Sequence, residues 1–90
     1  LLADLEDWSR SLERAQSQGQ LAQQQLALAE QGLAMMTTAF ASGNLPLSSL
    51  IQQEQALINF RIAAMKSIVN QHVILASLYH LMGEVHDQHE

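Results

Sequence analysis

A repeat of apolar residues at alternating steps of four and three limits most strongly what this 90-residue chain can fold into. All twelve positions of the repeat are apolar or glycine: Leu1, Leu5, Trp8, Leu12, Ala15, Gly19, Ala22, Leu26, Ala29, Leu33, Met36 and Phe40. These steps align side chains along one face of an α-helix, and their persistence over so many turns is typical of a coiled coil. We therefore predict a helix over about residues 2–41. It would be about 60 Å long, and a helix of that length needs a partner along its whole length.

A short break follows the repeat, and its residues predict a tight turn at 42–46 (Ser42, Gly43, Asn44, Leu45 and Pro46). Gly43 suits the left-handed conformation just past the end of a helix. Pro46 suits the first turn of a second helix, because the N–H that proline lacks would have no partner there. A connection this short joins antiparallel neighbours.

The second helix is predicted from about residue 46 to 82, with Gly83 ending it and residues 84–90 forming a polar tail. Two apolar stripes at heptad spacing run along it. The first stripe is Leu47, Ile51, Ile58, Met65, His72 and Tyr79, and the second is Leu50, Leu57, Ala64, Ile68, Leu75, Leu78 and Met82. Two stripes predict two neighbouring helices. The fold class is therefore all-α, a long antiparallel helical hairpin that resembles a coiled coil.

The outer positions of this helix also become apolar toward its end: Ile62, Val69, Val73, Ile74 and Ala76. One hairpin cannot cover that surface by itself, so we expect the isolated chain to self-associate. The additional helices would come from other subunits or from further chain. Since the sequence opens on Leu1 rather than Met, we expect it to be part of a longer protein.

Composition argues against several classes of function. The chain has no cysteine, a net charge of −5 and four scattered basic residues, so it has no clustered basic face for nucleic acid. No apolar run is long enough to span a bilayer. No nucleotide-binding glycine loop, catalytic triad or pair of facing carboxylates is present. We predict that the chain is not an enzyme and that it uses no cofactor.

The segment from Phe40 to Glu54 and the ending from Ala76 to Gly83 resemble TolC-type outer-membrane efflux proteins. In that family an aromatic residue, a glycine and a small polar residue mark the tip of a helical hairpin, and an aliphatic helix ends in glycine. Two positions depart from the family pattern. Pro46 stands where Ser or Thr is usual, and Ser49 stands where Asp is usual. In the family, acidic residues near this end help form a charged constriction, and Ser49 cannot supply a fixed charge to it.

The resemblance implies that this is the periplasmic hairpin of the family's second, C-terminal repeat. It would be a fragment of an α-helical barrel, within a homotrimer anchored in the outer membrane. The protein would be a passive conduit for export driven by an inner-membrane pump. The tip residues Ser42, Gly43, Asn44, Leu45 and Pro46 would contact a periplasmic adaptor protein. The alternatives are the hairpin of an adaptor itself, a generic coiled-coil interaction module, and a soluble four-helix bundle formed by two hairpins.

Two groups of polar residues carry open interpretations. Glu54 and Arg61 lie on the apolar stripes of the second helix. They either set the register as a half-exposed ion pair, or face the lumen or a neighbouring protomer of a tunnel. Near the end of the chain, His80, Glu84, His86 and His89 are weak candidates for metal binding. We predict no metal site, because such a site needs three or four ligands that are fixed by their surroundings.

Overall fold

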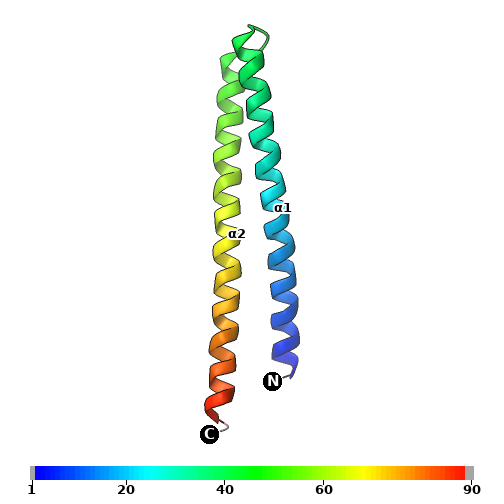
Figure 1. Ribbon diagram of the computed structural model, residues 1–90, viewed down its shortest axis with the longest axis vertical. Helices are drawn as coiled ribbons and strands as arrows, with labels where there is room; N and C mark the ends of the chain where they lie inside the picture. The colour runs from blue at the N-terminus through cyan, green and yellow to red at the C-terminus, as the bar shows by residue number, and fades with distance from the viewer. Residues whose placement is uncertain (1, 89–90) are drawn as a thin grey trace.

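The computed structural model describes residues 2–88, with side chains over 4–84, and consists of two long helices joined by one turn (Figure 1). Helix α1 spans Leu2–Ala41 and helix α2 spans Leu47–Gln88. The start of α1 and the end of α2 lie at one end of the molecule, and the turn lies at the other. The molecule measures 71 × 16 × 14 Å, so it is a rod only two helices wide. The prediction of an all-α antiparallel hairpin is confirmed.

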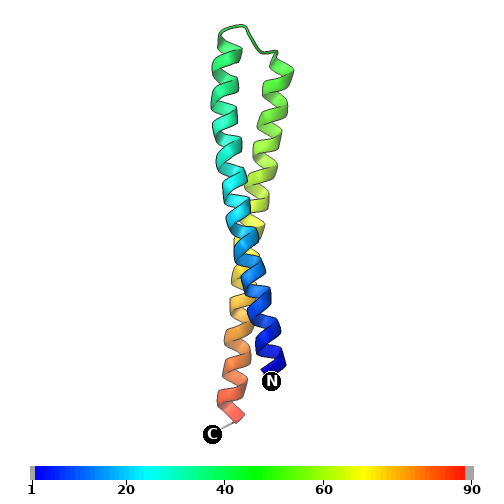
Figure 2. The same cartoon turned by 90° about the vertical axis from the view of Figure 1, so that its right-hand side faces the viewer.

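The helices wind around each other rather than running as straight parallel rods. They lie side by side in one view, and in the view turned by 90° their ribbons cross near the middle (Figure 2). This winding follows from the heptad spacing. A repeat of 3.5 residues drifts around a straight helix of 3.6 residues per turn, and supercoiling keeps the seam facing its partner.

The predicted seam of α1 faces α2. Every member from Trp8 to Met36 is buried or half-buried, while Leu5 and Phe40 at its two ends are exposed. Leu1 lies outside the described residues. The buried residues of the hairpin are mostly small: Ala15, Gly19, Ala22, Ala29, Leu57 and Ala64. Small side chains let the two helix axes approach closely, and the core is consequently thin.

Five members of the second predicted stripe of α2 lie on its inner face, with Leu50, Leu57, Ala64, Leu75 and Leu78 buried or half-buried. Ile68 and Met82 of that stripe are exposed. Polar side chains also lie on this face. Gln53 donates a hydrogen bond from Nε2 to the carbonyl oxygen of Ala29 at 3.1 Å. Two members of the α2 inner face, Ser67 and Gln71, lie close to Gly19 of α1.

The end of α2 corrects the predicted boundary. We expected Gly83 to end the helix and residues 84–90 to form a tail, but α2 continues through Gly83 to Gln88. Glycine in a helix costs only about 1 kcal/mol relative to alanine. The His80–Glu84 contact at 3.0 Å bridges this turn of the helix. No proline follows Gly83 in the sequence, so no residue after it interrupts the hydrogen bonds of the helix.

Candidate functional site

The turn between the helices is built by a hydrogen-bonded helix cap. The N–H of Gly43 donates to the carbonyl oxygen of Phe40 at 3.0 Å, and the N–H of Asn44 donates to that of Ala39 at 2.9 Å. Gly43 has a φ of 78°, the left-handed conformation that this cap requires. These two bonds satisfy carbonyl groups that the end of a helix would otherwise leave without partners.

The five predicted tip residues therefore lie together at the closed end of the rod. Ser42, Gly43, Asn44 and Pro46 are exposed, and Leu45 is half-buried. Pro46 directly precedes α2, and its carbonyl oxygen accepts the N–H of Ser49 at 3.1 Å, which begins the first turn. The tip is an uncharged surface whose backbone is held by hydrogen bonds.

The first predicted stripe of α2 faces away from α1. Its members, which we name the α2 outer stripe, are all exposed: Leu47, Ile51, Ile58, Met65, His72 and Tyr79. The predicted outer residues Ile62, Val69, Val73 and Ala76 are exposed beside it. A soluble protein rarely leaves an apolar surface of this length uncovered, so this face is the strongest candidate for an interaction.

Ile74 is an exception among the predicted outer residues. It is half-buried at the interface with α1, where its carbonyl oxygen accepts a hydrogen bond from Nε1 of Trp8 at 2.9 Å. This bond lies near the open end of the hairpin and joins the two helices there. Trp8 thus anchors α1 through its indole N–H as well as through its apolar ring.

Helix α1 carries an apolar line that the sequence reasoning missed. Leu21, Leu28 and Met35, which we name the α1 outer stripe, lie outside the seam and are 53%, 67% and 74% exposed. Their spacing of seven residues is the signal that would have found them. The two helices therefore each present one stripe to the partner helix and one stripe to solvent.

Glu54 and Arg61 both lie on the exposed side of α2. They are two helical turns apart, and among the side chains of residues 4–84 no ion pair joins them. This arrangement leaves both charges free to meet groups on another molecule. The interpretation of Glu54 and Arg61 as residues that face a lumen or a neighbouring protomer therefore stays a prediction.

The metal candidates are only partly described. Nε2 of His80 lies 3.0 Å from Oε1 of Glu84, and these side chains are 78% and 59% exposed. His86 lies near the end of α2, where side chains are not described, and His89 lies outside the described residues. Within the described part of the chain no three histidine or acidic groups gather at one point. The described contact is an exposed ion pair at the i, i+4 spacing of a helix.

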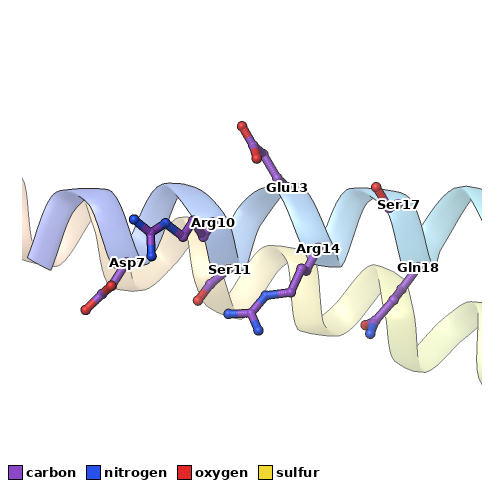
Figure 3. A pocket seen from close by; sticks show the side chains of 7 residues that line it. All are labelled: Asp7, Arg10, Ser11, Glu13, Arg14, Ser17 and Gln18. Carbon is purple, nitrogen blue, oxygen red and sulfur yellow. The ribbon is translucent and has the colours of Figure 1, made fainter.

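A shallow depression on the N-terminal half of α1 is lined by polar and charged side chains (Figure 3). Glu13 and Ser17 point to one side of the helix, whereas Asp7, Arg14 and Gln18 point to the other. A site for nucleophilic acyl transfer needs a nucleophile, a base and an oxyanion donor within hydrogen-bond reach of a common point. The side chains of this depression diverge, so it does not form such an arrangement.

Over the residues that the structure describes, neither helix has a stretch both long and apolar enough to cross a membrane. No family model matches this sequence, and comparisons with curated proteins and with solved structures gave no match. Function is therefore inferred from the shape of the hairpin and from its exposed surfaces.

Proposed function

We propose that this hairpin forms part of the wall of a periplasmic tunnel in an outer-membrane efflux channel of the TolC type. The intact protein would be a homotrimer in the outer membrane, with this segment in the periplasm. It would act as a passive conduit, because an inner-membrane pump, coupled through a periplasmic adaptor, supplies the work. The hairpin itself would carry no catalytic residue.

The observation that carries the proposal is the α2 outer stripe. A helix in a closed wall must pack on two neighbours, so it needs two apolar stripes. Helix α2 has one stripe buried or half-buried against α1 over most of its length and another that stays exposed from Leu47 to Tyr79. The rod is 71 Å long, which suits a wall whose helices run along a channel axis.

The exposure and the uncharged character of the tip support the proposed contact with an adaptor. It protrudes beyond both helices, most of its residues are exposed, and none of the residues from Ser42 to Pro46 carries a charge. Two hairpins that meet end to end need turns that keep their shape. The cap at Gly43 provides this without side-chain ordering, which lowers the entropic cost of docking.

Substitution of Gly43 tests the proposal in the full-length protein. No atom lies within 4 Å of the position that a Cβ would occupy, so a new side chain meets only the backbone strain of a φ of 78°. Gly43→Val should distort the turn, because a β-branched residue is an outlier at positive φ. Gly43→Asn is the matched control, since asparagine tolerates this conformation.

The readouts are photo-cross-linking to the adaptor from exposed Ser48, and export of a pump substrate by the cells. We expect Gly43→Val to lower both, and Gly43→Asn to keep both near the parental level, at equal amounts of trimer in the outer membrane. Unchanged cross-linking and export in Gly43→Val would refute the assignment of the tip.

The second candidate is an interaction module, either the hairpin of a periplasmic adaptor or a generic coiled-coil scaffold. The favouring observation is that the α2 outer stripe is apolar at heptad spacing, which any amphipathic helix can match. Fractionation of cells that express the full-length protein separates the candidates. An outer-membrane location supports the channel, and its absence from that membrane supports the module.

A further inference from the structure

The two outer stripes lie on opposite broad faces of the hairpin. One groove between the helices is lined by Gln16, Gln20 and Gln23 of α1 and by Ile68 of α2. Met65 of the α2 outer stripe lies one turn from Ile68, so that stripe borders this groove. The groove on the other face is lined by Arg14 and Gln18 of α1 with Asn70 of α2.

The α1 outer stripe borders that second groove. Leu21 lies one turn from Gln18 and two turns from Arg14, and Leu28 and Met35 continue the same line. One hairpin therefore cannot bring its two outer stripes together, because α1 exposes its stripe on one face and α2 exposes its stripe on the other.

The two outer stripes are nevertheless level along the rod. Contacts across the hairpin place Gly19 beside Ser67 and Gln71, and Gly32 beside Gln53. Through this correspondence each residue of α1 has a counterpart at the same height on α2. To within a helical turn, Leu21 lies level with Met65, Leu28 with Ile58, and Met35 with Ile51.

We propose that the α2 outer stripe is the docking site for the α1 outer stripe of a second copy of this chain, with the turns of the two hairpins level. Leu21, Leu28 and Met35 of the second copy would pack against Met65, Ile58 and Ile51 of the first. Helix α2 runs antiparallel to the α1 that it receives, as it does to its own α1. The two hairpins are then parallel and side by side.

Polar residues at the ends of the two outer stripes determine the position of one copy along the long axis of the other. Arg14 and Asp7 continue the line of the α1 outer stripe, and His72 and Tyr79, the last two members of the α2 outer stripe, lie at the same levels. A slide by one heptad in one direction would place Leu21 beside His72, and a slide in the other would place Met65 beside Arg14. Only the level arrangement pairs all three apolar residues of α1 with apolar residues of α2.

The contact does not end at a dimer. Each contact joins the α1 outer stripe of one copy to the α2 outer stripe of another. A dimer therefore still exposes one free α1 outer stripe and one free α2 outer stripe. Such a heterologous contact generates rings or open arrays. The inference extends the proposed wall of hairpins but does not depend on export, because the contact can be tested on the isolated chain.

Disulfide cross-linking of the 90-residue chain tests the contact, and the chain has no cysteine of its own to interfere. Leu28→Cys and Ile58→Cys are each made alone, and both are combined in one chain. The matched control replaces Leu28→Cys by Ala27→Cys, a neighbouring exposed residue that points away from the α1 outer stripe. All variants are oxidised at equal concentration, after circular dichroism has shown that their helix contents match.

We expect a mixture of the two single variants to form a disulfide-linked dimer, and each single variant alone to remain monomeric on a non-reducing gel. The doubly substituted chain should give a ladder of trimers and larger species, because its two cysteines lie on opposite faces and cannot pair within one hairpin. The Ala27→Cys control should cross-link at least tenfold less.

Two results would overturn the inference. Strong cross-linking of Ile58→Cys with itself would show that α2 packs on α2 in a symmetric dimer. Absence of cross-links in the mixture, with a stable helical monomer in sedimentation, would show that the stripes do not meet. Neither result would bear on export by the full-length protein, so the failure of this inference and of the proposed function are distinguishable.

Discussion

Adjacent residues of α2 should respond very differently to truncation. Leu57 is 5% exposed and packs against α1, whereas Ile58 is 52% exposed on the α2 outer stripe. Replacement of a buried leucine by alanine costs about 2–5 kcal/mol of unfolding free energy, and the lower part of that range applies where the site can collapse. A seam only two helices wide collapses readily, so we expect Leu57→Ala to cost about 2–3 kcal/mol.

Ile58→Ala should change the unfolding free energy of the monomer by less than about 0.5 kcal/mol. The exposed isoleucine has no partner within the hairpin, and alanine has the higher helix propensity, which offsets part of the lost contact. The comparison must be made at low protein concentration, because self-association through the outer stripe would add to the apparent stability.

Urea unfolding followed by circular dichroism at 222 nm measures both values, with a linear extrapolation to water. Leu57→Ala should lower the urea midpoint strongly, and Ile58→Ala should leave it almost unchanged. An Ile58→Ala variant as destabilised as Leu57→Ala would refute the assignment of inner and outer faces.

Three further substitutions test local features by the same measurement. Gly83→Ala should stabilise the hairpin by about 1 kcal/mol, because Gly83 is helical and nothing lies within 4 Å of the new Cβ; a loss of stability would contradict the continuous helix. Gly43→Ala should destabilise it by about 1–2 kcal/mol because of the positive φ, and a neutral result would argue against the cap. Trp8→Phe should cost about 1 kcal/mol through loss of the hydrogen bond to Ile74, and an unchanged midpoint would show that this bond is not formed.

The sequence predicted the hairpin because its two strongest signals are local. The unbroken apolar line of α1 needs only helical periodicity to be recognised, and Gly43 and Pro46 mark the turn through backbone geometry alone. The turn observed at residues 42–46 is the one that these signals predict, and the contact of its five residues with a partner stays a prediction.

The choice between the two α2 stripes could not be predicted in this way. Both are apolar at heptad spacing, and which one packs on α1 depends on the fit between side chains of two helices. The inner stripe contains Ala64, which suits the close approach set by Ala15 and Ala22 of α1. His72, which the sequence places on the first apolar stripe, lies on the stripe that remains exposed.

Polar residues of the inner face were missed because a search for apolar repeats passes over them. Gln53 and Gln71 fit there since α1 places Gly32 and Gly19 opposite, where no side chain takes up the space. At Gly83 the sequence signal predicted a helix end that the structure does not have. Glycine is a frequent helix terminator, but it ends a helix only where the chain also turns away.

The bond between Trp8 and Ile74 has a consequence for how the hairpin assembles. The two residues are 66 positions apart, whereas Gln53 and Ala29 are 24 apart, so closing the loop first at Trp8 would cost about 0.9 kcal/mol more in chain entropy. Pairing should therefore begin beside the turn and proceed toward the open end. Because Trp8 is the single tryptophan of the sequence, its fluorescence would report the last contacts to form and the first to fray.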